Sequence, residues 1–286
     1  MRESSVQCIS PGGLHRMAYT EWGDPDNDRV LVCVHGLARC ARDFDFLAQA
    51  VCDKYRVVCP DVVGRGQSDW LKLKAFYGVP QYVADMVTLL ARVNAKTVHW
   101  VGTSMGGLIG MALAGMENTP ISRLVLNDVG PVIAVQSLQR ICAYFGKAPR
   151  FDSYEQAEAM MRMLAATFGK LTDAQWRHLT LHAIRTAADG KIEFRYDPGI
   201  AEGLRQSLEQ AQGKDLESWP LYDAIACPTL LLRGAQSDLL LAETAAQMAT
   251  RGPRARCVEI PEVGHAPTLY DAAQIAVVRD FLLEEG

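Results

Sequence analysis

Short apolar runs alternate with longer amphipathic segments along most of the chain. Runs rich in Val, Leu and Ile are typical of strands buried on both faces of a parallel sheet, and the amphipathic segments are typical of helices that cover it. Two extended segments joined at Pro11-Gly12-Gly13 predict an N-terminal hairpin. The expected strands are Val6–Ile9, Leu14–Trp22, Val30–Val34, Arg56–Cys59, Val98–Val101, Arg123–Leu126, Thr229–Leu232 and Ala255–Ile260. The expected helices are Phe44–Val51, Pro80–Val93, Met105–Met116, Ala242–Thr250 and Ala272–Leu283.

This alternation stops between about residues 131 and 220, where helical periodicity dominates. Thr172-Asp173-Ala174-Gln175 has the spacing of a capping box, which predicts the start of a helix. Asp189-Gly190 predicts a turn, followed by a short extended piece over Lys191–Tyr196. We therefore expect two parts: a core formed by residues 1–130 and 221–286, and a mainly helical unit over 131–220 inserted between two core strands.

The candidate nucleophile lies in Gly102-Thr103-Ser104-Met105-Gly106, between an expected strand and an expected helix. A G-x-S-x-G sequence in this setting forces the serine into a strained turn that exposes its hydroxyl at the carboxyl edge of the sheet. The following helix directs its N-terminal N–H groups at the same point, where they stabilise an anion. The pentapeptide alone also fits a Gly- and Ser-rich helix cap, so the interpretation depends on the strand before it and the helix after it.

A nucleophilic serine needs a base, and the base needs an acid that orients it. His265 follows the last expected strand, and Asp238 follows the all-apolar strand Thr229–Leu232 and a Gly-containing turn. Ser104, Asp238 and His265 are therefore the expected catalytic residues. Asp128, directly after another buried strand, is the alternative acid, or a residue that contacts the inserted unit, the substrate or the histidine loop.

Two backbone N–H groups are expected to form an oxyanion hole. His35-Gly36-Leu37 follows the buried strand Val30–Val34, which suits a loop that presents the N–H of Leu37. The N–H of Met105, next to the nucleophile, is the second donor. Arg39 and Phe44, which follow this loop, and Trp70 are candidate substrate-binding residues, although a surface role fits the Arg39 charge equally well.

Taken together, the motifs resemble those of the α/β-hydrolase superfamily, particularly its bacterial esterase-like members. They occur in the family's order over most of the chain: His35-Gly36-Leu37, Asp61-Val62-Val63-Gly64-Arg65-Gly66-Gln67-Ser68, Gly102-Thr103-Ser104-Met105-Gly106-Gly107, Arg233-Gly234 with Asp238, and Gly264-His265. The resemblance implies a mostly parallel eight-stranded sheet flanked by helices, with residues 131–220 as a helical cap. It implies hydrolysis of carboxylic esters with no metal and no organic cofactor.

The composition of the chain limits the binding partners and the cellular location that we expect. The 286 residues are 49% hydrophobic, enough for a sizeable core, and the net charge of −4 with scattered Lys and Arg argues against a nucleic-acid partner. No apolar stretch is long enough to span a membrane, and Met1–Gln7 lacks the apolar region of a secretory signal. The eight cysteines include no C-x-x-C pair, which favours reduced thiols and a cytoplasmic location. A homo-oligomer is left open.

Other histidines are weaker candidates for chemistry. His178 and His182 are four residues apart on an expected helix, but the sequence around them offers no third ligand. A helix-surface role is therefore preferred, and no metal site is expected. His99 lies inside a strand, where packing is the expected role.

The sequence thus predicts a serine hydrolase that cleaves a small carboxylic ester through an acyl-enzyme on Ser104. One alternative is a carbon–carbon bond hydrolase of a meta-cleavage-type diketone, which shares the Ser-Met-Gly-Gly elbow but carries a more glycine-rich oxyanion loop. Another is a non-catalytic ligand-binding protein on the same scaffold.

Overall fold

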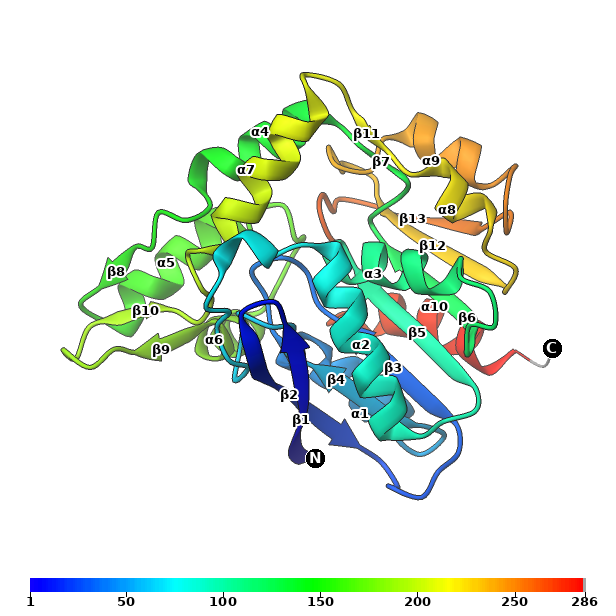
Figure 1. Ribbon diagram of the computed structural model, residues 1–286, viewed down its shortest axis with the longest axis horizontal. Coiled ribbons are helices and arrows are strands. Elements are labelled where there is room, and N and C mark those ends of the chain that lie inside the picture. The colour runs from blue at the N-terminus through cyan, green and yellow to red at the C-terminus, as the bar shows by residue number, and fades with distance from the viewer. Residues whose placement is uncertain (285–286) are drawn as a thin grey trace.

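The computed structural model describes residues 1–284, which form an eight-stranded sheet between two layers of helices (Figure 1). The strand order is β1-β2-β4-β3-β5-β6-β12-β13. Six adjacent strands are parallel, and the hairpin β1–β2 adds an antiparallel edge through pairing of β2 with β4. The eight strands are β1 (Arg2–Ser10), β2 (Gly13–Trp22), β3 (Val30–Val34), β4 (Arg56–Pro60), β5 (Val98–Thr103), β6 (Ile121–Asn127), β12 (Thr229–Gly234) and β13 (Arg256–Ile260). The expected α/β-hydrolase sheet is confirmed.

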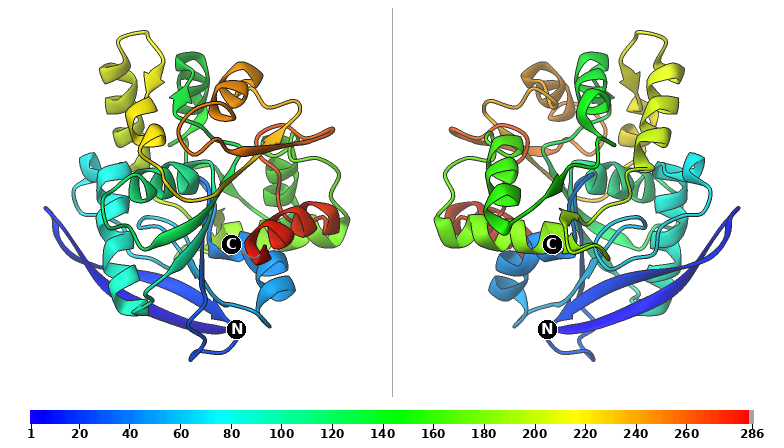
Figure 2. Two further views of the ribbon diagram at one scale, coloured as in Figure 1. Left: turned by 90° about the vertical axis from the view of Figure 1, so that its right-hand side faces the viewer. Right: turned by 90° about the vertical axis from the view of Figure 1, so that its left-hand side faces the viewer.

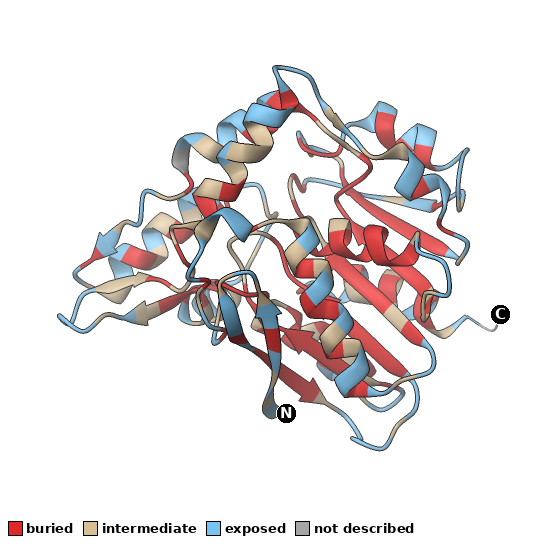
Figure 3. Cartoon of the chain, in the orientation of Figure 1, coloured by how far each residue is buried: buried red, intermediate tan, exposed pale blue. Residues whose placement is uncertain are grey.

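Helices cover both faces of this sheet, which explains the continuous apolar runs of its strands (Figure 2). Neighbouring residues of a strand point to opposite faces, so Trp100 packs in one core cluster and Val101 in the other. The first cluster includes residues of α2 and α3, and the second includes residues of α1 and α10; Figure 3 shows this burial along the strands. The helices of the core are α1 (Asp45–Val51), α2 (Val79–Val93), α3 (Met105–Ala114), α8 (Trp219–Asp223), α9 (Ala242–Met248) and α10 (Ala272–Leu283), with 3-10 turns η1 (Ala41–Phe44) and η2 (Lys74–Phe76).

The segment between β6 and α8, here called the insertion, has its own small elements. It contains α4 (Val135–Tyr144), α5 (Tyr154–Leu164), α6 (Asp173–Ala183) and α7 (Ile200–Ala211), and short strands β7 (Val132–Ile133), β8 (Arg150–Phe151), β9 (Ile184–Thr186), β10 (Ile192–Phe194) and β11 (Leu216–Glu217). The expected capping box of Thr172 and Gln175 starts α6. The insertion is less purely helical than expected, because β8, β10 and β9 form a three-stranded sheet and β7 pairs with β11. The helix α8, which begins at Trp219, packs on α3 of the core.

The insertion lies over the carboxyl ends of the parallel strands (green to yellow in Figure 1). Hydrogen bonds join it to the loops that follow β3 and β13, among them Arg39 to the carbonyl of Leu179, Cys40 to the carbonyl of His182, and the N–H of Gly264 to the carbonyl of Thr167. These contacts place it above the edge where G-x-S-x-G serines are exposed. Among residues 1–284, no helix is long and apolar enough to cross a bilayer. All eight cysteines are free thiols.

Candidate active site

Ser104 occupies the sharp turn between β5 and α3. Its backbone angles are φ 51° and ψ −115°, a conformation that costs free energy for a residue with a side chain. The neighbouring glycines permit the turn: a Cβ on Gly102 would lie 2.2 Å from the carbonyl oxygen of Gly106, and one on Gly106 would lie 2.0 Å from that of Val34. The sequence therefore folds here into the sharp strand–turn–helix elbow that the motif predicts.

His265 connects the Ser104 hydroxyl to a carboxylate. Its Nε2 lies 2.9 Å from Ser104 Oγ, and its Nδ1 lies 2.7 Å from Asp128 Oδ2. Because the carboxylate can only accept, Nδ1 carries the proton and Nε2 is free to accept from the serine. This set, called here the Ser104–His265–Asp128 trio, has the connectivity of a nucleophile, a base and an orienting acid.

Asp128 is held by donors from the turn after β12. Its side chain is fully buried, its Oδ1 accepts from the N–H of Gly234 at 2.8 Å, and its Oδ2 accepts from the hydroxyl of Ser237 at 2.6 Å. The Ser237 hydroxyl also accepts from the N–H of Leu240 at 3.1 Å, which fixes its direction. A buried carboxylate needs such partners, because an unpaired one is strongly destabilising.

Asp238, the expected orienting acid, is not in contact with His265. Its side chain is 54% exposed and forms an ion pair with Arg140 of α4. The turn from Gly234 to Asp238 does reach the site, but through the N–H of Gly234 and the hydroxyl of Ser237. The placement predicted for Asp238 is therefore wrong, and the alternative, Asp128 after β6, occupies the position next to the histidine.

The loop that carries His265 is held from two sides. On the core side, the carbonyl of Val263 accepts from the N–H of Gln236 at 2.8 Å, and Asn127 Nδ2 donates to the carbonyl of Pro267 at 2.8 Å. On the insertion side, the N–H of Gly264 donates to the carbonyl of Thr167 at 2.7 Å. The position of the imidazole thus depends on both the core and the insertion. Sequence patterns gave no signal for Ser237, Asn127 or Thr167, because their partners lie far away in the chain.

The loop after β3 is fixed by two buried side chains. His35 Nδ1 donates to the carbonyl of Gly36 at 2.7 Å, and its Nε2 accepts from the N–H of Val62 at 3.0 Å. Burial lowers the pKa of His35 to about 4, which keeps the ring neutral and able to accept. The fully buried Arg65 donates through Nε to the carbonyl of Leu37 at 2.8 Å. His35 therefore supports this loop and does not contact Ser104 as a base.

The two expected oxyanion donors belong to segments that adjoin Ser104. Met105 is the first residue of α3, so its N–H has no acceptor inside the helix. The loop before Leu37 approaches closely, since a Cβ built on Gly36 would lie 3.7 Å from Ser104 Cβ. Leu37 directly follows Gly36 in this loop, so its N–H remains the expected second donor.

A small cavity of about 40 Å³ adjoins the trio. It is lined by residues next to Ser104 and His265 and by the loop after β3: Arg39, Asp43, Phe44, Thr103, Phe168, Leu179, Ala266, Pro267, Thr268 and Tyr270. Arg39 and Phe44, two of the candidate substrate-binding residues, are therefore at this site. Trp70 is not: it lines another pocket near Leu71 and Lys72, and the guanidinium of Arg185 lies 4.4 Å from its ring centre.

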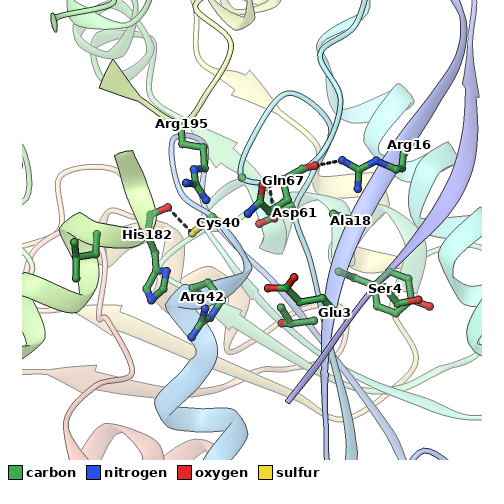
Figure 4. Close-up of a pocket in the computed structure, with 14 residues that line it drawn as sticks. Glu3, Ser4, Arg16, Ala18, Cys40, Arg42, Asp61, Gln67, His182 and Arg195 are labelled. Carbon is green, nitrogen blue, oxygen red and sulfur yellow. Dashed lines mark hydrogen bonds between the residues drawn. The ribbon is translucent and has the colours of Figure 1, made fainter. Parts of the chain in front are cut away.

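A larger, polar cavity of about 530 Å³ opens between the hairpin β1–β2 and the insertion (Figure 4). Its wall includes the side chains of Arg16, Arg42 and Arg195, together with Glu3 and the buried Asp61. Asp61 stabilises its own glycine-rich turn by accepting from the N–H of Gln67 at 2.8 Å, and it also accepts from the N–H of Ala41 in η1 at 2.7 Å. Neither the trio nor its chain neighbours line this cavity, whereas Thr103 and Ala266 line the small one, so size alone does not mark the chemical centre.

The structure adds a third residue to the histidine pair on α6. His178, His182 and Asp45 have potential ligand atoms within 4.8 Å of one another, a juxtaposition invisible in the sequence. The carboxylate of Asp45 is already bound by Arg42, however, whose Nε lies 2.9 Å from Oδ1 and 2.8 Å from Oδ2. His178 Nε2 lies 3.0 Å from the carbonyl oxygen of Arg42. Asp45 and His178 therefore already have partners, and their contacts link α6 to η1 and α1. A second group, Cys8, His15 and Asp85, is buried under the hairpin and contains a His15–Asp85 contact of 3.0 Å.

Comparisons with known proteins identify the family of the chain. The profile described as the alpha/beta hydrolase family matches residues 31–278. The chain is 53% identical over 280 residues to a 3-hydroxybutyrate-oligomer hydrolase from Cupriavidus necator, covering 96% of each sequence. It superposes on the crystal structure of an alpha/beta hydrolase from Novosphingobium aromaticivorans with a TM-score of 0.83, at 34% identity over 98% of both chains. An M. tuberculosis esterase, 22% identical over 98% of this chain and 92% of the esterase, shares the fold with a TM-score of 0.72. The findings support a hydrolase, and the chain belongs to the alpha/beta hydrolase family.

Proposed function

We propose that this protein is a serine hydrolase that cleaves the carboxylic ester bonds of short 3-hydroxybutyrate oligomers through an acyl-enzyme on Ser104. The observation that carries the proposal is the position of His265, within hydrogen-bond distance of both Ser104 and the buried Asp128. The substrate class rests on the Cupriavidus necator relative, whose 53% identity extends over nearly the whole chain.

In this mechanism, Ser104 Oγ attacks the ester carbonyl carbon while His265 Nε2 accepts its proton. The charged imidazole is stabilised by Asp128, which keeps the proton on Nδ1 and fixes the ring. The N–H groups of Leu37 and Met105 stabilise the negative oxygen of the tetrahedral intermediate, and removal of one such donor typically costs about 10²–10³-fold in kcat. His265 then protonates the leaving alcohol, and water releases the acyl group by the same steps.

We also propose that the insertion acts as a cap over the site, with residues 1–130 and 221–286 as the core. The contacts of Thr167, Leu179 and His182 with the loops that carry His265, Arg39 and Cys40 support this role. A cap excludes water from the reacting groups and shapes the pocket for the substrate. Substitutions of apolar side chains facing the small cavity, such as Phe168→Ala, should therefore change chain-length preference more than they change the labelling of Ser104.

The test combines covalent labelling with turnover. A fluorophosphonate probe should label the protein, and the Ser104→Ala variant should lose both labelling and hydrolysis of the linear 3-hydroxybutyrate dimer, by about 10⁴-fold or more. Mass spectrometry of a reaction quenched with acid should find the acyl group on the peptide that contains Ser104. Labelling that survives in Ser104→Ala, or turnover confined to a ring-cleavage diketone offered in parallel, would contradict the proposal.

A further inference from the structure

Tyr270 lines the small cavity beside the trio, and its phenol hydroxyl has no hydrogen-bond partner within residues 1–284. Tyr270 is 5% exposed, and its hydroxyl is buried without a donor or acceptor among the residues that the structure describes. A buried hydroxyl left unpaired costs about 1–3 kcal/mol, so such a group needs an explanation. Burial and the nearby Asp43 raise the pKa of Tyr270 well above its ordinary value, which keeps the hydroxyl protonated and able to donate.

Arg39 lines the same cavity, and its ion pair with Asp43 does not use all of its N–H donors. Its Nε and Nη2 bind the two oxygens of Asp43 at 2.9 and 2.6 Å, and Nη2 also donates to the carbonyl of Leu179 at 3.3 Å. The remaining nitrogen, Nη1, has only the thioether sulfur of Met161 as a partner, at 3.6 Å. Sulfur is a weak acceptor and a guanidinium has five N–H groups, so this end of Arg39 retains donor capacity.

The cavity has a suitable size and place for a charged substrate group. A volume of about 40 Å³ accommodates two or three water-sized atoms, comparable to a carboxylate. Thr103 and Ala266, the chain neighbours of Ser104 and His265, line the same space. A Cβ built on Gly36 would lie within 4 Å of both Ser104 Cβ and Arg39 Cγ, so the Arg39 stem starts close to the nucleophile.

We infer that Arg39 and Tyr270 bind the free carboxylate of the substrate, which makes the protein selective for esters of hydroxy acids that end in a carboxylate over neutral esters. The inference rests on the proposed function and adds a recognition group to it. A guanidinium nitrogen and a phenol hydroxyl are both donors, and a carboxylate is the acceptor that satisfies both. Asp43 fixes Arg39 in place with its bidentate contact and leaves Nη1 directed to other partners.

The experiment compares two substrates that differ only in charge: the linear 3-hydroxybutyrate dimer as the free acid and its methyl ester. The readout is the ratio of kcat/KM for the acid to that for the methyl ester. Tyr270→Phe should lower this ratio about tenfold to a hundredfold, since a hydrogen bond to a charged group is lost. The double variant Arg39→Gln with Asp43→Asn removes both charges, so that neither residue remains as an unpaired charge. It should lower the ratio at least as much as Tyr270→Phe does. Tyr154→Phe, on the outer helix α5 with its hydroxyl 3.5 Å from the carbonyl of Arg177, is the matched control and should leave the ratio within about twofold.

A binding measurement separates failure of the inference from failure of the proposed function. Calorimetry on the Ser104→Ala protein should detect the free acid, with affinity at least tenfold higher than for the methyl ester, and Tyr270→Phe in that background should remove the difference. Equal binding or equal kcat/KM of the two compounds, unchanged by Tyr270→Phe, would mean that the cavity holds only water and would overturn the inference while ester hydrolysis stands. If the Ser104→Ala protein bound the acid selectively but the wild-type protein did not hydrolyse it, the proposed function would be contradicted and the carboxylate site would be supported.

Discussion

The turns after β6 and β12 lie side by side at the carboxyl edge of the sheet, and each carries an aspartate after a buried strand. Asp128, after β6, is fully buried and is held by Gly234, Ser237 and His265. Asp238, after β12, is 54% exposed and pairs with Arg140. The two turns are therefore parts of one site, because the turn after β12 supplies the donors that hold the carboxylate of the turn after β6. An acid that orients a histidine needs enclosure and donors, and neither follows from its place after a strand.

The largest expected effect comes from the buried carboxylate. Asp128→Asn should lower kcat for p-nitrophenyl butyrate by about 10³–10⁴-fold, because the amide removes the negative charge and can favour the wrong tautomer of His265. Circular dichroism and thermal melting of the same sample check that the fold persists. A loss below tenfold would show that Asp128 does not orient the base.

The supporting donor should have an intermediate effect. Ser237→Ala removes a hydrogen bond to the Asp128 carboxylate, and such bonds to charged groups contribute about 1.5–3 kcal/mol. We expect kcat to fall about tenfold with little change in KM. Ser122→Ala, at the opposite end of β6, is the matched control and should leave kcat within about twofold. Equal kcat values for the two variants would mean that the turn after β12 does not support the acid.

Burial should also determine how the stability of the protein depends on pH. His35, which lies outside both turns, tests this effect of burial on a titratable side chain. Burial lowers the pKa of His35 from 6.5 to about 4. The unfolded chain then takes up a proton between these pH values and the folded protein does not, so this contribution to stability is complete above about pH 6.5 and is lost as the pH falls toward 4. His35→Asn should make the slope of the unfolding free energy against pH shallower in this window, by up to about 1.4 kcal/mol per pH unit.

Urea unfolding at several pH values measures these slopes. Asp61, whose pKa burial raises to about 6, acts in the opposite direction, since its protonated form is favoured in the folded state. It is present in both proteins, so it cancels when the slopes are compared. Identical slopes would mean that His35 titrates normally in the folded protein.

The smallest effect should come from the exposed carboxylate. Asp238→Asn breaks an ion pair that water screens, and exposed pairs contribute about 0–1 kcal/mol to stability. Its kcat should stay within about twofold of the wild-type value. A loss comparable to that of Asp128→Asn would restore the assignment suggested by the sequence.

Much of the core was predictable because its signals are local. The period of the apolar residues located the strands and covering helices, and the G-x-S-x-G motif located the elbow at Ser104. The pairing of Ser104 with His265 followed from chain order in a resembling family. The choice between Asp128 and Asp238 could not be predicted, because both residues follow buried strands. Ser237, whose hydroxyl binds the Asp128 carboxylate, lies among turn residues that give no sign of this contact in the sequence. Tyr270 and the third member of the His178 group were missed for the same reason: their neighbours come from distant segments.

The contact between His265 and Asp128 can be observed most directly by proton NMR of the imidazole Nδ1–H. A proton shared with a buried carboxylate resonates far downfield and is protected from solvent exchange. We expect such a signal in the wild-type protein and in Asp238→Asn, and its loss in Asp128→Asn and in a His265→Gln reference. Persistence of the signal in Asp128→Asn together with its loss in Asp238→Asn would show that Asp238, and not Asp128, binds the imidazole.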